Sequence, residues 1–115
     1  MSSLKINSPD NYQDEIEKII YKYGLRIKAM HFHKDVDLML IILNNKKVLV
    51  RTISEFKRLK NATEKQLNRY LLIGKGTGVH WPDTDEDLSL KGFVKYEMLT
   101  SIQNKKRILA DLHIS

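Results

Sequence analysis

The chain has 115 residues, 42% of them hydrophobic, and a formal net charge of +6, so it predicts one domain with a core of its own. The absence of cysteine excludes disulfides, thiolate zinc sites and thiol nucleophiles. The longest apolar run, residues 38–43, is too short to cross a bilayer, and the first residues lack the order of a signal peptide, so we expect a cytoplasmic protein with no membrane contact.

The first predicted element is a helix over residues 9–23. Ser8 is a favourable capping residue, Pro9 suits the first helical position, and Gly24 suits the end of a helix. Between them, apolar residues follow helical spacing.

Three strands are predicted next, over residues 26–33, 37–43 and 47–53. The middle run is continuously apolar, which indicates a strand with both faces covered. Asn44 and Asn45 suit a two-residue hairpin loop, because asparagine tolerates positive φ. We therefore expect a three-stranded antiparallel meander.

A helical crossover and a second strand pair follow. Thr52 with Glu55, and Thr63 with Gln66, have the spacing of capping boxes. Residues 70–73 and 79–81 predict short strands joined by a glycine-rich turn.

The last predicted element begins at Leu90, behind the capping residue Ser89. It is either one closing helix or a closing helix followed by a separate helix from Thr100 or Ser101 to near Leu112. This amphipathic end either docks on its own domain or offers its apolar stripe to a partner helix or a second copy. The stripe consists of Ile102, Ile108, Leu109 and Leu112, beside Lys105, Lys106 and Arg107.

Basic residues concentrate in the stretch 46–75, ahead of an acidic block at residues 83–87. Either these cations contact nucleic acid or an acidic partner, or they are the solvated faces of a lysine-rich protein. Phe56 and Tyr70 lie among them, as base-stacking platforms or as ordinary core residues. The candidate contact residues are Lys46, Lys47, Arg51, Lys57, Arg58, Lys60, Arg69 and Lys75.

Two further patterns have a chemical and a structural interpretation. Gly74, Gly76 and Gly78 resemble a phosphate-binding loop superficially, but a strand follows them where such a loop needs a helix, which favours a tight hairpin. His80 with Asp83 and Asp85 suggests a divalent-metal hydrolase, although the ligand spacing of a calcium loop is absent and turn or capping roles are the alternative.

His31 and His33 lie two apart on a predicted strand and therefore face the same side, but a metal site would need a third ligand. No nucleophile elbow or pair of catalytic carboxylates is recognisable. We expect no enzyme activity, no metal and no cofactor.

Several motifs recur in a distinctive order. Residues 59–66 read LKNATEKQ, residues 72–82 read LIGKGTGVHWP, and residues 85–93 read DEDLSLKGF. Over residues 25–93 this resembles the bacterial domain-of-unknown-function family 2442. The resemblance implies the same compact α+β domain and no established activity, ligand or functional residues. It also implies gene arrangements like those of toxin–antitoxin pairs, and occasional fusion to helix-turn-helix regions, of which this chain has none.

The expected fold class is therefore α+β: a three-stranded antiparallel meander, a helical crossover, a short second strand pair and a closing helix. Residues 1–24 form an N-terminal helical extension, residues 25–96 the family-like domain and residues 97–115 a helical tail, in one compact unit. The motif residues expected to be structural are Gly74, Gly76, Gly78, His80, Trp81, Asp85, Asp87 and Ser89. Trp81 is expected to be buried under the closing helix near Leu90 and Phe93.

The expected function is a non-enzymatic protein-interaction module, antitoxin-like or accessory to another small protein, with self-association as a further option. The alternative is a nucleic-acid-binding or regulatory protein that uses the basic stretch.

Overall fold

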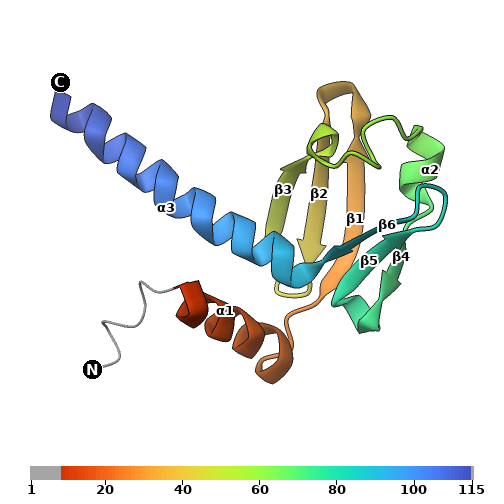
Figure 1. The fold of residues 1–115 in the computed structure, drawn as a ribbon, viewed down its shortest axis with the longest axis horizontal. Helices are drawn as coiled ribbons and strands as arrows, with labels where there is room; N and C mark the ends of the chain where they lie inside the picture. Colours follow the sequence, from red (N-terminus) through yellow and green to blue (C-terminus); the bar gives the residue numbers. More distant parts are fainter. Residues whose placement is uncertain (1–8, 115) are drawn as a thin grey trace.

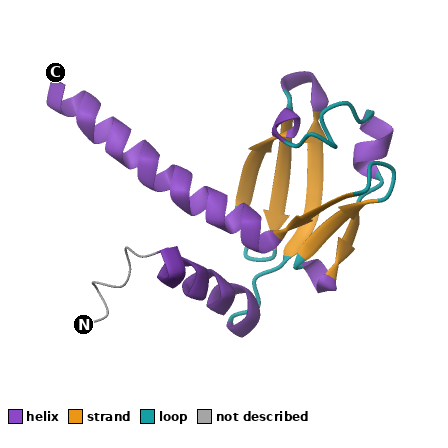
Figure 2. Cartoon of the chain, viewed as in Figure 1, coloured by secondary structure: helices purple, strands orange, loops and turns teal. Residues whose placement is uncertain are grey.

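A computed structural model describes residues 9–114, which form two three-stranded antiparallel sheets with a helix at each end of the chain (Figures 1 and 2). Sheet A contains β1 (Ile27–His33), β2 (Leu38–Leu43) and β3 (Val48–Thr52), in that order. Sheet B contains β4 (Leu71–Ile73), β5 (Gly78–Trp81) and β6 (Glu86–Ser89). The helices are α1 (Pro9–Glu17), α2 (Glu64–Asn68) and α3 (Leu90–Ile114). The α+β class and the meander are thus confirmed.

The first helix continues from α1 into a π-helical turn, Lys18–Lys22, and ends before Gly24. Gly24 has φ +78°, a conformation that suits glycine at a helix end. Ile16 and Ile20 are buried and anchor this segment to the core. The prediction of a helix over residues 9–23 is confirmed, while the expected cap at Ser8 lies outside the described residues.

Sheet A has one buried face. Met39, Ile41 and Leu43 on β2 are buried, whereas Leu38 and the alternate positions after it are only partly covered. In Figure 1 only the first turns of α3 overlap this sheet. These turns pack on the buried face, because their residues Leu90 and Phe93 are part of the core. The expectation that both faces of β2 are covered is therefore wrong, since the described chain supplies no second layer.

The crossover uses both predicted capping boxes. The backbone N–H of Gln66 donates to Thr63 Oγ1 (3.1 Å), and the N–H of Thr63 donates to Gln66 Oε1 (2.9 Å). The same reciprocal arrangement links Thr52 and Glu55. Each box satisfies backbone donors that a helix start leaves free, so these short helical turns begin where the sequence predicts.

Sheet B has one strand more than predicted. The expected pair β4–β5 is present, and β6 pairs with β5 through the acidic block, with His80 opposite Asp87. Strand β6 forms because Leu88 packs against the core, while its neighbours Asp87 and Ser89 are exposed. The packing of Leu88 outweighs the low strand propensity of the acidic residues.

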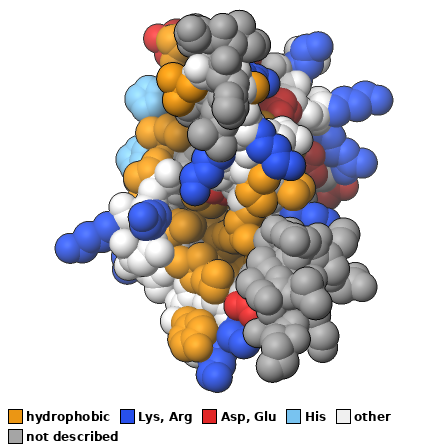
Figure 3. Space-filling view, turned by 90° about the vertical axis from the view of Figure 1, so that its left-hand side faces the viewer, with side chains coloured by type: hydrophobic (Ala, Val, Ile, Leu, Met, Phe, Trp, Pro, Cys, Tyr) orange, Lys and Arg blue, Asp and Glu red, His pale blue; other side chains and the backbone are white. Residues whose placement is uncertain are grey.

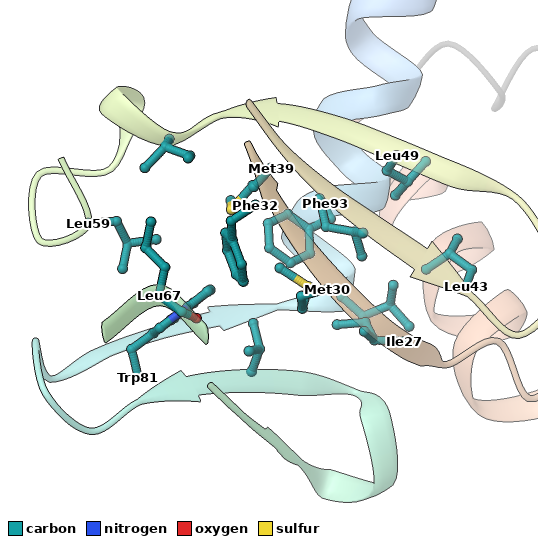
Figure 4. Packing of buried hydrophobic residues seen from close by; sticks show 14 of the residues in the cluster. Ile27, Met30, Phe32, Met39, Leu43, Leu49, Leu59, Leu67, Trp81 and Phe93 are labelled. Carbon is teal, nitrogen blue, oxygen red and sulfur yellow. The ribbon is translucent and has the colours of Figure 1, made fainter. Parts of the chain in front are cut away.

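The core lies between the two sheets and under the first turns of α3 (Figure 4). Trp81 is fully buried, as predicted. Its indole N–H donates to the carbonyl of Leu67 (3.0 Å), and its ring meets Phe32 edge-on at 6.1 Å between ring centres. Leu90 and Phe93 belong to the same buried cluster. Trp81 therefore joins the sheets to each other and to α2.

One continuous helix, α3, closes the chain, rather than two. Ser89 caps it, since its Oγ accepts a hydrogen bond from the N–H of Gly92 (3.0 Å). Leu90 and Phe93 are buried, but residues 103–107 are all exposed, and the helix projects away from the body (Figure 1). Within residues 9–114, no helix has the length and apolar character that crossing a membrane requires.

Candidate functional site

The basic residues of the stretch 46–75 do not gather on one surface. Lys46 and Lys47 lie in the β2–β3 connection, whereas residues 57–60 lie beyond the other end of β3. A strand of five residues separates the two groups by roughly 17 Å. Lys75 lies in the turn between β4 and β5, part of the second sheet.

Arg51 is held inside the fold. Its guanidinium carbon lies 3.6 Å from the centre of the Tyr96 ring and 4.8 Å from that of Phe56. Its Nε is 3.5 Å from Glu55 Oε2, and its side chain is only 12% exposed. The cation–π contact with Tyr96 holds β3 against α3. Arg51 therefore has a structural role in the fold.

The acidic block pairs with cations from the crossover. Arg58 contacts Asp85, with Nη1 donating to its carbonyl oxygen at 2.6 Å, and Arg69 Nε donates to Asp83 Oδ2 at 2.7 Å. Three of the four side chains are more than half exposed and that of Asp83 is 29% exposed, so the pairs contribute little stability, of order 0–1 kcal/mol each. They nevertheless offset the positive charge of this end of the molecule.

The proposed metal ligands do not converge. Asp83 and Asp85 point to different arginines, while His80 Nδ1 lies 2.5 Å from Asp87 Oδ1. Across residues 9–114, no three histidine or carboxylate side chains are placed to hold a metal ion. His31 and His33 share the outer face of β1, without a third ligand beside them.

We accordingly expect the purified protein to carry no stoichiometric metal and to keep its melting temperature in excess EDTA. Metal analysis by mass spectrometry and a thermal melt with and without chelator measure both quantities. A melting temperature that falls in EDTA and recovers with one added divalent cation would contradict this prediction.

The glycine-rich segment is a hairpin turn, as predicted, and not a phosphate loop. Strand β5, and not a helix, follows it directly, and the N–H of Leu90 at the start of α3 is taken up by the carbonyl of Thr77 in the turn (2.9 Å). Gly74 and Gly76 have φ +55° and +98°, and Lys75 between them also has a positive φ of 57°. A Cβ on Gly76 would lie 2.7 Å from the carbonyl oxygen of Ile27, so this glycine lets the turn dock on β1.

Beside this turn lies the most open apolar feature of sheet B, the edge strand β4. Leu71, Leu72 and Ile73 are 54%, 37% and 44% exposed. Exposed edges usually carry charges or proline that discourage pairing with another chain, and β4 carries neither. Within the described residues, β4 is paired only with β5.

An open pocket of about 460 Å³ adjoins the end of β4 at Ile73. Its lining includes Gly78 and Ile73, which lie so close that a Cβ on Gly78 would be 3.1 Å from Ile73 Cγ1, and Tyr21 of the π-helical turn. Four of the motif residues line it: Gly74, Gly78, Asp87 and Ser89. We call this pocket and strand β4 together the β4 surface. Sequence reasoning predicted the strand but missed the surface, whose only signal was three uncharged apolar residues in a row.

The two sheet meanders, the crossover and the closing helix define a small α+β domain with an exposed sheet edge. The chain belongs to the family described as protein of unknown function (DUF2442), whose model matches residues 27–98. This confirms the resemblance carried by the motifs. No curated protein matches the chain.

Two solved bacterial structures have the same fold. One, a protein of unknown function from Rhodospirillum rubrum, is 25% identical, with a TM-score of 0.55 over 62% of this chain and 86% of that one. The other, an uncharacterised protein from Chromobacterium violaceum solved by NMR, is 21% identical, with a TM-score of 0.57 over 77% and 81% of the two chains. The latter likeness concerns the fold alone.

Proposed function

We propose that this chain is a non-enzymatic protein-interaction module of the cytoplasm, an accessory or antitoxin-like partner of another small protein. The observation that carries the proposal is the β4 surface. The part of the partner protein that binds the β4 surface is an extended segment. This segment adds a strand alongside β4 and places one side chain in the adjoining pocket. Strand addition gains affinity from main-chain hydrogen bonds and specificity from such pockets.

Charge favours a segment that is apolar in its centre and acidic at one end. Lys75 lies directly beyond β4 and forms no ion pair among the described residues, and the chain carries a net charge of +6. A segment with carboxylates near Lys75 would therefore be steered to the site.

The nucleic-acid alternative has less support. The cations that it needs are divided between the two ends of β3, and Arg51, Arg58 and Arg69 already have intramolecular partners. A gel-shift at varied salt measures it directly, because phosphate contacts impose a steep salt dependence. Tight, salt-sensitive binding of a DNA duplex would replace the present proposal.

The variant Leu71→Lys is expected to weaken binding of the protein encoded by the adjacent gene by at least tenfold. The substitution places a charge on the docking edge, while the 54% exposure of Leu71 means that the fold tolerates it. Co-expression followed by isothermal titration measures the affinity. Hydrogen exchange of the β4 amides, with and without the partner, reports strand addition.

Val36→Lys is the matched control. Val36 is also an exposed apolar residue, at 59%, but lies in the β1–β2 turn of the other sheet. It should bind as the unmodified chain does. Equal affinities for both variants, or unprotected β4 amides in the complex, would contradict the proposed docking edge.

A further inference from the structure

The pocket of the β4 surface lies on one face of sheet B. Residues paired directly across strands share a face, and two neighbouring rows cross this one. The first row is Ile73, Gly78 and Ser89, and the second is Leu71, His80 and Asp87. Gly78 has no side chain, and the position of its missing Cβ is 3.1 Å from Ile73 Cγ1. The apolar surface of β4 therefore continues over β5 toward β6.

The lining of this pocket is acidic, although the chain as a whole is basic. The net charge is +6, and Figure 3 shows lysine and arginine side chains projecting from several sides of one face. Among the described residues that line the pocket, the only charged one is Asp87, whose side chain is 67% exposed. Its Oδ1 lies 2.5 Å from His80 Nδ1, and its Oδ2 has no partner among the described side chains. One carboxylate oxygen is thus available to a ligand.

The lysines that flank the lining residues in the sequence do not neutralise this carboxylate. The Nζ of Lys91 bonds to Glu17 Oε1 at 2.5 Å, and the Nζ of Lys22 lies 5.6 Å from the centre of the Tyr23 ring. Lys75 forms no ion pair among the described residues, and it is the group that meets the acidic end of the segment proposed above. The pocket and the turn beside it therefore present charges of opposite sign.

The other polar groups of the lining also suit a cation. Tyr21 is 68% exposed, and the face of an aromatic ring attracts ammonium and guanidinium groups. Thr77 Oγ1 donates its hydrogen to the carbonyl of Gly74 (2.9 Å), so it can only accept a further hydrogen bond, as can the Asp87 carboxylate. Lysine and arginine side chains carry hydrogen-bond donors and no acceptor. Their chemistry complements that of the pocket.

We propose that the side chain which the pocket receives is a lysine or an arginine of the bound segment. This inference rests on the proposed function, in which the segment adds a strand alongside β4. Such a strand lies roughly 5 Å from β4 and roughly 10 Å from β5, so a short side chain opposite Ile73 ends over β4 itself. The long aliphatic part of a lysine or arginine crosses Ile73 to Gly78 and carries its charge toward Asp87.

Two small probes test the chemistry of the pocket without the partner. N-acetyl-arginine amide and the uncharged N-acetyl-citrulline amide have nearly the same shape. Each is titrated into the isotope-labelled full chain and followed by the backbone amide signals in two-dimensional NMR. We expect saturable shifts at Ile73, Gly78 and Ser89 with the arginine probe, and an affinity lower by about fivefold with the citrulline probe.

Asp87→Asn removes the charge and keeps an oxygen for His80, so it should weaken the arginine probe by about fivefold. Tyr21→Leu is a second variant, and the 68% exposure of Tyr21 means that the fold tolerates it. It should also weaken the arginine probe. Glu64→Gln is the matched control, because it removes the same charge from an exposed residue of α2 outside the lining. Thermal melts of all three variants verify that they are folded.

Equal affinities for the two probes would overturn the proposal, as would an unchanged affinity in Asp87→Asn or shifts centred away from the pocket. The docking edge is tested separately by Leu71→Lys with the protein encoded by the adjacent gene. Protected β4 amides in that complex, without shifts from the arginine probe, would remove the basic side chain and keep the edge. Normal partner binding by Leu71→Lys, with the arginine probe still bound, would remove the edge and keep the cation pocket.

Discussion

Replacing Trp81 with alanine is expected to lower the free energy of unfolding by about 3–5 kcal/mol, as for large aromatic truncations in cores. Trp81 is fully buried, stacks edge-on against Phe32, and bonds to the carbonyl of Leu67. Its loss leaves a cavity between the sheets and an unpaired carbonyl. Urea unfolding followed by circular dichroism measures the change, because the variant has no tryptophan fluorescence.

Trp81→Phe separates the two contributions. It keeps an aromatic ring in the core but loses the N–H donor, so the Leu67 carbonyl is left without this partner. We expect an intermediate loss of about 1–3 kcal/mol. A wild-type melting temperature for the alanine variant would contradict the role of Trp81 as the junction of the sheets.

Gly76→Ala is expected to cost about 2–4 kcal/mol, since a side chain there is strained and has no room. Gly76 has φ +98°, and an added Cβ would lie 2.7 Å from the Ile27 carbonyl oxygen and 3.3 Å from its nitrogen. Both neighbours are backbone of β1, so they yield only if sheet B moves away from sheet A. Chemical denaturation gives the free-energy difference.

Gly24→Ala is the matched control for the steric clash that Gly76→Ala makes with the backbone of Ile27. Gly24 has a comparable φ of +78°, yet an added Cβ meets nothing within 4 Å. It should cost only about 1 kcal/mol, the strain of positive φ alone. Similar losses for both variants would mean that the turn adjusts freely and that Gly76 does not set the distance between the sheets.

Local signals in the sequence were sufficient for much of the fold. Capping boxes, the helix end at Gly24 and the β4–β5 hairpin all depend on residues within a few positions of one another. Strand β6 was not predicted, because Glu86 and Asp87 favour a loop by themselves. Its conformation depends on pairing with β5 and on the partial burial of Leu88.

The candidate site was less predictable for the same reason. Arg58 and Asp85 are 27 positions apart, and Arg69 and Asp83 are 14 apart, so the sequence presents them as separate basic and acidic regions. The fold brings them together as pairs. Likewise, the apolar run 38–43 reads the same whether its own chain or another molecule covers its second face.

Each sheet is assembled from three consecutive strands, one between residues 27 and 52 and the other between residues 71 and 89. Hairpins with short connections close small loops at little entropic cost, so each meander can form locally. The contact between Phe32 and Trp81 closes a much longer loop, so we expect it to form late in folding. Weakening that encounter should mainly accelerate unfolding while leaving the folding rate nearly unchanged, which makes Trp81 a determinant of kinetic lifetime.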